Sequence, residues 1–445
     1  MQGMTRRRFI HHSLVSVGTA GAVASAARAV VPSSTPAAAS SSILGANEKI
    51  RLGLIGGGGM GCGDLRAFLR NDDVDCPVVC DVDDAHLADA VQNVQKARGK
   101  RPETVKDFRR LIDRKDIDVC LVGTPDHWHA LPTIYACQAG KDVYVEKPLA
   151  TSIGEGRAML EAARRYNRVV QMGTQWHSAE HFASAVAYVH SGKLGKIRLV
   201  RAWAYLSWVH GVGQPQDEPE APKGVDYDLW LGPAPKRPFN KARFHFSFRW
   251  FWDYAGGLMT DWGVHLINIA MWAMKVQAPT RVTCSGGKYV LDDIAETPDT
   301  QCTVYEFPGF LMTWEHQMEA AGATVEGREH GLAFYGTQGR LVLDAHGWEV
   351  VPGKDKKLPA EKHESKGDGR PEHIRNLLDC VRSRQQPIEN LEIGHAVSTT
   401  ALLGNLALLT KRAITWDAQK EQIVGDEQAN QMLTRPYRAP WKLEV

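Results

Sequence analysis

Three short stretches carry side chains whose types and spacing could oxidise an alcohol. They are Thr124-Pro-Asp-His-Trp-His129, Glu146-Lys147-Pro148 and Asp261-Trp-Gly-Val-His265. A histidine with an ordinary pKa of about 6.5 can take a hydroxyl proton at neutral pH, and a lysine beside the same oxygen favours the developing alkoxide. The i, i+4 spacing predicts that Asp261 and His265 share one face of a helix. Lys147, Asp261 and His265 are therefore the candidate catalytic residues.

Each of these residues also has an ordinary structural role. Lys147 taken alone is a solvated cation, His265 a hydrogen-bonded core histidine and Asp261 a helix-start carboxylate. Two histidine pairs, His127 with His129 and His177 with His181, have a spacing that suits metal ligands. Since no cysteine or carboxylate cluster completes such a site, we predict no required metal.

A glycine-rich stretch predicts the second partner in the reaction. Gly56, Gly58 and Gly61 fit G-x-G-x-x-G directly after an apolar run that begins at Ile50. In this motif the first glycine permits a tight turn, the second lets a pyrophosphate approach the backbone, and the third lets strand and helix pack closely. Such a stretch could also be only a mobile loop. Asp81 favours the interpretation as a cofactor site over that as a mobile loop, because it ends a second apolar strand twenty residues after Gly61.

Asp81 is placed to accept the ribose hydroxyls of NAD. The next residues, Val82-Asp-Asp84, include no Arg or Lys that would receive a 2′-phosphate, so we predict NAD rather than NADP. The loops that follow parallel strands should line the same crevice. The remaining predicted cofactor contacts are Met60, Thr124, Pro125, His129, Glu146 and Lys147.

The elements that must position these residues follow two patterns. From Lys49 to about Val170, short apolar strands alternate with amphipathic helices, which predicts a Rossmann-type doubly wound parallel sheet. After Met172 the strand-like runs predict a mainly antiparallel open sheet with helices, and Phe251–Met274 is predicted to be a helix. We therefore expect an α/β plus α+β fold. Its parts are a signal peptide and linker (1–47), an NAD-binding domain (48–172), a substrate and oligomerisation domain (173–420) and a C-terminal arm (421–445).

The N-terminal segment resembles a twin-arginine export signal. Thr5-Arg-Arg-Arg-Phe-Ile10 precedes a short run rich in Ala, Gly and Ser, with small-residue cleavage options near Ala27. A membrane anchor is the alternative, but the run is short for one, so we predict a removable signal and a periplasmic or otherwise exported protein. Export through this route in the folded state would let the enzyme acquire its cofactor in the cytoplasm. The export machinery is thus an expected partner.

Charge and cysteine usage exclude several other classes. The chain has a formal net charge of +2, and loss of the four arginines before residue 48 leaves the mature part at −2. No basic stripe indicates nucleic-acid binding. The eight cysteines include no C-x-x-C pair, and a strand separates Cys76 from Cys80 by more than a disulfide can span. We therefore expect reduced thiols.

A sugar, cyclitol or glycoside is the predicted substrate. Aromatic rings stack on the C–H faces of sugars, while charged side chains bond the hydroxyls. The alternative is that most of these tryptophans are core residues. We expect about half of them to be. The predicted substrate contacts are Lys147, Trp176, Arg201, Trp203, Arg249, Trp252, Asp261 and His265.

Together these motifs resemble the Gfo/Idh/MocA family of glucose–fructose oxidoreductase and inositol dehydrogenase, over residues 48–445. The most specific element is the E-K-P of Glu146-Lys147-Pro148, which follows Gly140-Lys-Asp-Val-Tyr-Val145. The resemblance implies that the E-K-P lysine and the D-x-x-x-H pair form the catalytic set. Because free NAD is scarce outside the cytoplasm, we expect an exported enzyme to hold its NAD tightly. The stretch from Gly425 to Trp441 resembles the exported, twin-arginine branch. A homo-dimer or homo-tetramer is also implied.

The resemblance leaves alternatives open. Certain family members are redox-assisted, NAD-dependent glycosidases that act through a transient keto-sugar, and those enzymes lack a clean E-K-P. The E-K-P in this chain favours an NAD(P)-dependent sugar or polyol dehydrogenase. The second alternative is a sugar-binding protein with a vestigial cofactor site, which the intact motifs disfavour.

Overall fold

The computed structural model describes residues 48–355 and 357–445, and the predicted export signal lies outside them. The first sheet has six parallel strands in the order β3-β2-β1-β4-β5-β6. The strands are β1 (Ile50–Ile55), β2 (Val74–Cys80), β3 (Glu103–Val105), β4 (Val119–Val122), β5 (Asp142–Val145) and β6 (Val170–Met172). Their carboxyl ends share one edge, which is where a doubly wound sheet binds ligands. The predicted parallel sheet is thus confirmed.

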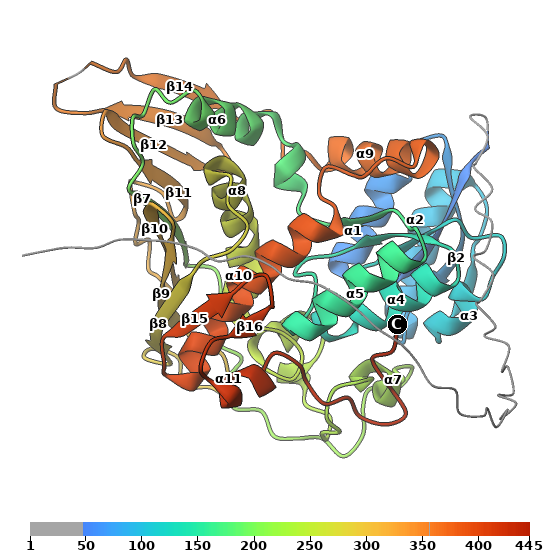
Figure 1. The fold of residues 1–445 in the computed structure, drawn as a ribbon. Coiled ribbons are helices and arrows are strands. Elements are labelled where there is room, and N and C mark those ends of the chain that lie inside the picture. The colour runs from blue at the N-terminus through green and yellow to red at the C-terminus, as the bar shows by residue number, and fades with distance from the viewer. Residues whose placement is uncertain (1–47, 356) are drawn as a thin grey trace, which may run out of the picture. The chain divides into compact units, whose positions relative to one another are not determined.

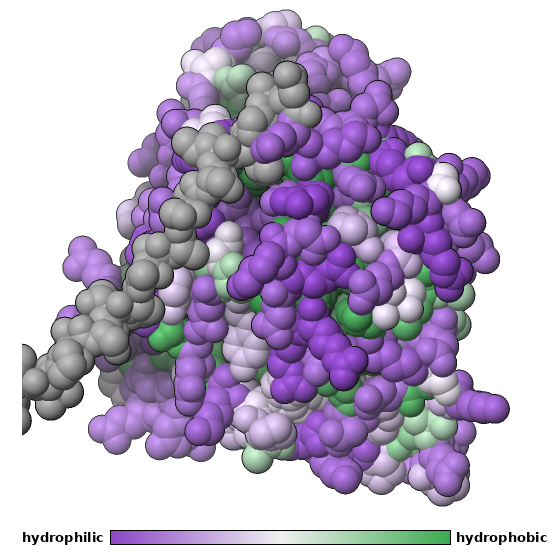
Figure 2. All heavy atoms as spheres, turned by 90° about the vertical axis from the view of Figure 1, so that its right-hand side faces the viewer, coloured by the Kyte–Doolittle hydropathy of each residue, from purple (hydrophilic) through white to green (hydrophobic). Residues whose placement is uncertain are grey.

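Local sequence explains where the helices of this part begin. These helices are α1 (Gly59–Phe68), α2 (Asp84–Arg98), α3 (Phe108–Ile112), α4 (Ala130–Gln138) and α5 (Ile153–Arg165), with a short 3-10 turn at Asp126–Trp128. Asp83 caps α2 by accepting a hydrogen bond from the amide of Ala85. Ser152 and Glu155 form a reciprocal capping box on α5. Figure 2 shows the side of the molecule on the right of Figure 1, where α3 lies, and this face is mainly hydrophilic.

The second sheet has ten strands in the order β14-β13-β12-β11-β7-β10-β9-β8-β15-β16, and it is mainly antiparallel, as predicted. Only the β7–β10 pairing among its described ladders is parallel. The strands are β7 (Leu199–Leu206), β8 (Arg281–Gly287), β9 (Thr300–Phe307), β10 (Phe310–Met318), β11 (His330–Tyr335), β12 (Gly339–Asp344), β13 (Gly347–Pro352), β14 (Glu361–Glu364), β15 (Ile414–Asp417) and β16 (Gln422–Ile423). Figure 1 shows α8 lying against this sheet.

The helices of this part are α6 (Glu180–His190), α7 (Tyr227–Leu231), α8 (Val264–Met274), α9 (Arg370–Ser383), α10 (Leu391–Thr410) and α11 (Glu427–Gln431), and 3-10 turns lie at Gln175–Ser178, Lys241–Arg243 and His245–Trp250. The predicted helix over Phe251–Met274 is wrong only in its first six residues. Residues 251–256 form turns and irregular chain, and a π-helical turn at Met259–Gly263 leads into α8. Two adjacent glycines, Gly256 and Gly257, disfavour a helix there, and Gly257 has φ +66°.

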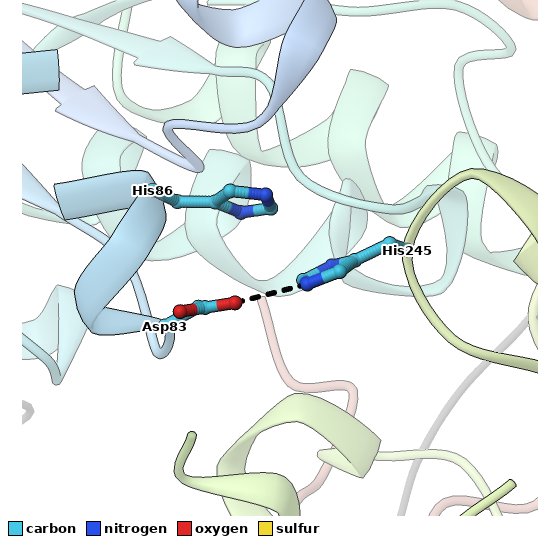
Figure 3. A group of neighbouring side chains, drawn as sticks. All are labelled: Asp83, His86 and His245. Atoms are coloured by element: carbon cyan, nitrogen blue, oxygen red, sulfur yellow. Dashed lines mark hydrogen bonds and ion pairs between the residues drawn. The ribbon is translucent and has the colours of Figure 1, made fainter. Parts of the chain in front are cut away.

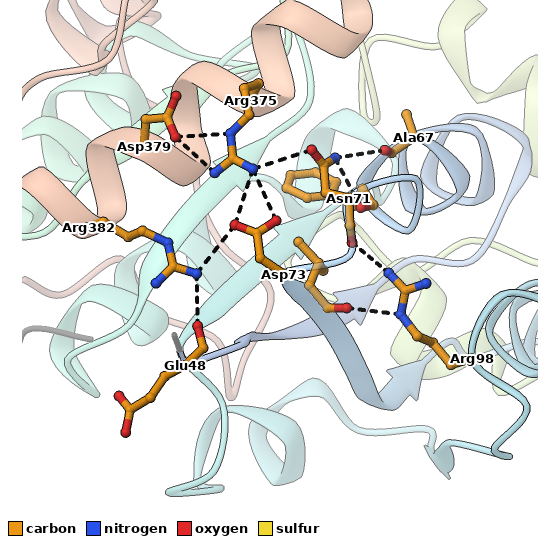
Figure 4. A network of polar contacts seen from close by, with 10 residues as sticks. Glu48, Ala67, Asn71, Asp73, Arg98, Arg375, Asp379 and Arg382 are labelled. Carbon is orange, nitrogen blue, oxygen red and sulfur yellow. Dashed lines mark hydrogen bonds and ion pairs between the residues drawn. The ribbon is translucent and has the colours of Figure 1, made fainter. Parts of the chain in front are cut away.

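Helix α9 returns late in the chain to cover the first sheet. Ile374, Leu377 and Leu378 are fully buried in one cluster with the strand residues Ile50 and Leu52. A polar network fastens the outer side of this contact, since Arg375 and Arg382 both bind the carboxylate of Asp73, at 3.0 and 3.3 Å (Figure 4). The C-terminal segment also packs on this part, and Trp441 contacts Trp128 edge-on. Its extended course after α11 matches the prediction, but the short helix was not expected.

Helix α10 is the longest helix of the described part. It is the one helix there that is long and apolar enough to cross a membrane, but 72% of that stretch is buried inside the protein. This burial identifies it as a core helix. All eight cysteines, which lie in the described residues, are free thiols, as predicted.

Candidate active site

The glycine-rich turn between β1 and α1 leaves room for a diphosphate. A Cβ on Gly56, whose φ is +94°, would lie 2.7 Å from the carbonyl carbon of Gly123, and a Cβ on Gly61 would lie 1.9 Å from the Gly56 oxygen. The nearest atom to a Cβ on Gly58 is 3.4 Å away. No side chain caps α1 at Gly58. The first amide groups of α1 therefore remain available to an anion, which fits the pyrophosphate of NAD.

Asp81 is held at the end of β2 by backbone donors. Its Oδ2 accepts a hydrogen bond from the amide of Gly57 at 2.6 Å, and its Oδ1 accepts one from the amide of Asp83 at 2.9 Å. The Nδ1 atom of His86 lies 3.5 Å from Oδ2. The contact with Asp81 raises the pKa of His86, against the effect of burial. The carboxylate is thus tied to the glycine turn and faces the cavity beside it.

A cavity of about 360 Å³ runs along the carboxyl edge of the first sheet. The predicted cofactor contacts Gly56, Gly58, Met60 and Asp81 line it, and so do Thr124, Pro125, Glu146 and Lys147. Gly61 instead lies against Gly56, so it shapes the turn. The opposite wall comes from the later part of the chain, and of its residues only Arg249 was predicted to contact a ligand. Its residues are Leu229, Trp230, His245, Phe246, Phe248 and Arg249.

His245 joins this wall to the first sheet (Figure 3). Its Nε2 lies 2.9 Å from Oδ2 of Asp83, and its ring lies 4.3 Å from the ring of His86, centre to centre. His245 has φ +49°. Ligand-type atoms of Asp83, His86 and His245 all lie within 4.8 Å of one another, a spacing at which a metal ion could be held. The absence of a required metal therefore stays a prediction.

Lys147 and Asp261 meet where the two parts of the chain join. The Nζ of Lys147 donates to Oδ1 of Asp261 at 2.6 Å and to its backbone oxygen at 3.1 Å. The Nε of Arg249 donates to the same Oδ1 at 3.1 Å. Burial alone would raise the pKa of Asp261, but the charges of Lys147 and Arg249 outweigh burial and hold the pKa well below its usual range. Asp261 is therefore ionised at neutral pH.

His265 lies one turn further along, at the start of α8. Its Nδ1 is buried and has no hydrogen-bond partner among the described residues. Burial, and then the charge of Lys147, lowers its pKa to about 3. The indole of Trp176 covers its ring at 4.9 Å. Asp261 lies in a π-helical turn, and its carboxylate bonds Lys147 and Arg249. Its charge opposes the fall in the pKa of His265, so the two groups also lie near each other.

Asp126 lines the cavity together with the carboxyl groups of Asp81 and Glu146, and sequence reasoning gave Asp126 no role. It follows β4 and is 7% exposed. Burial raises its pKa to about 7, although Arg249 and Lys147 oppose the rise. Asp126 and Asp261 thus share the same cations but have pKa values on opposite sides of the ordinary range. Such divergence is a common sign of acid–base function.

Glu146 connects the site to α9. It is buried, and burial raises its pKa, while Lys147 opposes the rise. A Cβ on Gly173 would lie 2.2 Å from its Oε1, so only glycine fits there. Arg370 at the start of α9 donates to Asp64 at 2.6 Å, and burial followed by Glu146 raises the pKa of Asp64 well above its usual range. The lysine of E-K-P is therefore backed by a buried acidic pair.

Four other residues that were predicted to contact the cofactor or the substrate instead contact other parts of the protein. His129 bonds the carbonyl oxygens of Pro148 and Thr124 at 2.7 and 3.0 Å, so it joins two site loops without lining the cavity. Trp252 donates to the carbonyl of Glu296. The structure brings neither Arg201 nor Trp203 to the site. Arg201 pairs with Glu315 on β10, and Trp203 belongs to a small cluster separate from the one that contains Val200 and Ala202.

Comparisons with known proteins agree with this architecture. Residues 50–174 match the family described as "Oxidoreductase family, NAD-binding Rossmann fold". Residues 189–443 match the one described as "Oxidoreductase family, C-terminal alpha/beta domain". The solved levoglucosan dehydrogenase, in complex with NADH and levoglucosan, has a TM-score of 0.64 at 19% identity and covers 82% of this chain and 99% of its own. At this identity the likeness concerns the fold.

Curated relatives match a shorter stretch. Glycosyl hydrolase family 109 protein 2 of Shewanella sp. (strain ANA-3) is 30% identical over 180 residues, which are 39% of this chain and 40% of that protein. Levoglucosan dehydrogenase of Pseudarthrobacter phenanthrenivorans is 30% identical over 164 residues, or 36% and 42%. The matched stretch spans about two fifths of the length of these relatives, and the relatives differ in their named activities.

Proposed function

Because the chain belongs to the Gfo/Idh/MocA oxidoreductase family and has an NAD-binding Rossmann domain, we propose that it moves a hydride between a sugar or cyclitol hydroxyl and NAD. One observation carries this proposal. Lys147 and Asp261, far apart in the sequence, are joined at 2.6 Å, and Lys147 lines the cavity beside the glycine turn. A buried lysine next to a dinucleotide cavity is suited to hold a reacting oxygen.

Each residue of the set has a proposed role. Lys147 holds and polarises the substrate hydroxyl, and Asp261, which also binds Arg249, orients Lys147 through their ion pair. His265 is neutral at physiological pH because its pKa is about 3, so it can accept a hydrogen bond from the substrate hydroxyl, while Asp126, with a pKa of about 7, is the stronger base that takes up the released proton. NAD bound in the cavity would accept the hydride from the same carbon. Trp176 fixes the ring of His265 from one side.

We further propose that the cofactor is held tightly. Asp81 lines the adenosine end of the cavity, and its carboxylate suits the ribose hydroxyls of NAD better than the extra phosphate of NADP. The contact between His245 and Asp83 holds a wall of the cavity against the first sheet. A cofactor retained in this way would be recycled by a second substrate. Release of the nucleotide on denaturation, but not on gel filtration, is the expected result.

A redox-neutral glycosidase is the second candidate function. The observation that favours it is the likeness of part of this chain to glycosyl hydrolase family 109 protein 2 and, at 27% identity over 154 residues, to alpha-N-acetylgalactosaminidase of Shewanella oneidensis. Such an enzyme would cleave a glycosidic bond beside a transient ketone. The intact Glu146-Lys147-Pro148 favours the simple dehydrogenase.

One experiment separates the two functions. Native protein is mixed with free sugars, cyclitols and aryl glycosides, while NADH absorbance and product masses are followed together. NADH formation with a product two hydrogens lighter supports the dehydrogenase. Glycoside cleavage without net NADH supports the glycosidase and rejects the main proposal. Binding of sugar with no bound nucleotide and no turnover would reject both enzymes.

Export and assembly are separate proposals. The twin-arginine motif at Arg6-Arg7 supports transport to the periplasm. Changing both to lysine in a fusion with a periplasmic reporter should abolish export, and undiminished export would reject the proposal. We also propose a homo-dimer or homo-tetramer on family grounds. Light scattering of the mature protein tests it, and a monomer at micromolar concentration would contradict it.

A further inference from the structure

An open cavity lies next to the catalytic residues and is distinct from the cofactor cavity. It has a volume of about 510 Å³, and its lining includes Trp208, His210, Lys241, Phe246 and Ser247. Trp208 is 52% exposed and Phe246 is 57% exposed. Two large exposed aromatic side chains therefore line one open cavity. Exposed apolar groups that gather in this way usually mark a binding site.

Ring contacts connect this cavity to the reaction end of the site. Trp208 lies 6.4 Å from Trp262, which lies 6.3 Å from Trp176, and Trp176 covers His265 at 4.9 Å. These spacings lie in the range of aromatic pairs in contact. Trp262 directly follows Asp261 in the π-helical turn. The π-helical turn therefore holds both Asp261, which bonds Lys147, and Trp262, whose ring lies next to that of Trp208.

A second connection runs through Phe246, which lines both cavities. The guanidinium of Arg249 lies 4.6 Å from the ring centre of Phe246 while its Nε binds Asp261. The exposed cavity thus begins one side chain beyond the catalytic ion pair. Lys147, Asp261 and His265 do not line this cavity, so a sugar ring bound at Lys147 needs a second ring, joined by a glycosidic bond, to occupy it.

We infer that Trp208 and Phe246 form a second sugar subsite, so that the substrate is a glycoside of at least two rings rather than a free monosaccharide. The inference rests on the proposed function, since it places the reacting ring at Lys147. Aromatic faces stack on the C–H surface of a pyranose, and the polar side chains at the rim suit its hydroxyls. His210, close to Glu319 at 3.4 Å, and the exposed Lys241 and half-buried Ser247 supply that rim.

The kinetic test compares two-ring and one-ring substrates in the wild type, in a variant of the cavity and in a control variant. We would measure kcat/KM for p-nitrophenyl glycosides, disaccharides and the parent monosaccharides with Trp208→Ala. The change should lower kcat/KM for the two-ring substrates about twofold to tenfold, the range of one aromatic contact, and leave the monosaccharide value unchanged. Tyr289→Ala is the control, because Tyr289 is 71% exposed and lines neither cavity.

A binding test keeps the inference independent of turnover. Calorimetric titration of the NAD-loaded wild type and Trp208→Ala with a disaccharide and its monosaccharide requires no redox reaction. Selective loss of disaccharide affinity in Trp208→Ala supports the subsite even if no sugar is oxidised. Equal affinity for one and two rings in the wild type, or an equal loss for both in the variant, overturns it. Oxidation of free sugars without any preference for glycosides also overturns the subsite while it leaves the dehydrogenase intact.

Discussion

The two ends of the cofactor cavity are built in different ways. At the adenosine end, the amide of Gly57 reaches Asp81 across 24 positions of one β-α-β segment, and backbone groups do most of the positioning. At the reaction end, Lys147 and Asp261 are 114 positions apart and come from the two different parts of the fold. The glycine turn and Asp81 thus form a local motif, whereas the later part of the chain must fold against the first sheet to complete the cavity wall and to bring Asp261 to Lys147.

The charges of the two ends differ as well. Asp81 is bound by two amides, which fix the direction in which it would accept the ribose hydroxyls in the proposed complex. The reaction end instead holds two carboxyl groups of opposite behaviour, with the pKa of Asp261 far below and that of Asp126 raised to about 7. Cations placed by tertiary contacts make the difference, because Asp261 bonds Lys147 and Arg249 directly while Asp126 gains only their more distant charge. Such a pair suits proton transfer at neutral pH.

The largest effect should follow changes at the reaction end. Lys147→Ala or His265→Ala is expected to lower kcat by about 10²- to 10⁴-fold, because each removes a group that acts on the reacting oxygen or its proton. NAD affinity should stay within about threefold of the wild type. Steady-state kinetics and nucleotide titration measure the two. A melting temperature close to the wild type serves as the folding control, since Asp261 loses one partner in Lys147→Ala. Full activity in either variant would remove the proposed mechanism.

The opposite pattern is expected at the adenosine end. Asp81→Ala should weaken NAD binding about 10- to 100-fold, the range for a hydrogen bond to a charged group, while kcat at saturating NAD changes little. Asp84→Ala is the matched control, because this neighbouring carboxylate is largely exposed and pairs with Lys106. If Asp81→Ala lowered kcat as strongly as affinity, the division of labour between the two ends would be wrong.

The pH dependence should report the reaction end alone. Asp126 is protonated below pH 7 and ionised above it, because its pKa is about 7. Alcohol oxidation releases a proton that an ionised carboxylate in the cavity can take, so kcat for oxidation should rise about tenfold as the pH increases through 7. Asp126→Asn should flatten this rise and leave NAD affinity unchanged. A rise of the same size in the variant would assign the titration to another group. His265 should add no step between pH 5 and 9, since its pKa is about 3.

The smallest effect should concern the contact that closes the adenosine end. His245→Ala and Asp83→Asn each remove the 2.9 Å bond between the two parts, and we expect NAD to dissociate about twofold to tenfold faster. Stopped-flow displacement of bound NADH measures the rate. His363→Ala is the control, because His363 makes the same kind of contact, with Glu180 at 2.9 Å, outside the cavity lining. An unchanged rate of NADH release in both His245→Ala and Asp83→Asn would mean that this contact does not limit cofactor exchange.

Local sequence patterns were sufficient for the parallel sheet, the antiparallel sheet and the NAD-binding turn. Strand alternation, caps such as Ser152 and the spacing of Gly56, Gly58 and Gly61 act over a few residues, so they can be seen in the chain without the fold. The position of Asp81 at the end of β2 follows from the same short-range logic.

Long-range packing settled the rest. Strand alternation could not say which face of β7 meets the site, and Arg201 and Trp203 pair with β10 and a separate cluster instead. The π-helical turn that contains Asp261 has no distinct periodicity in the sequence, so it could not be predicted from the chain alone. The wall formed by residues 229–249 reaches the first sheet only because both parts are folded. The raised pKa of Asp126 likewise arises from burial, which is a property of the assembled fold and not of the motif that contains it.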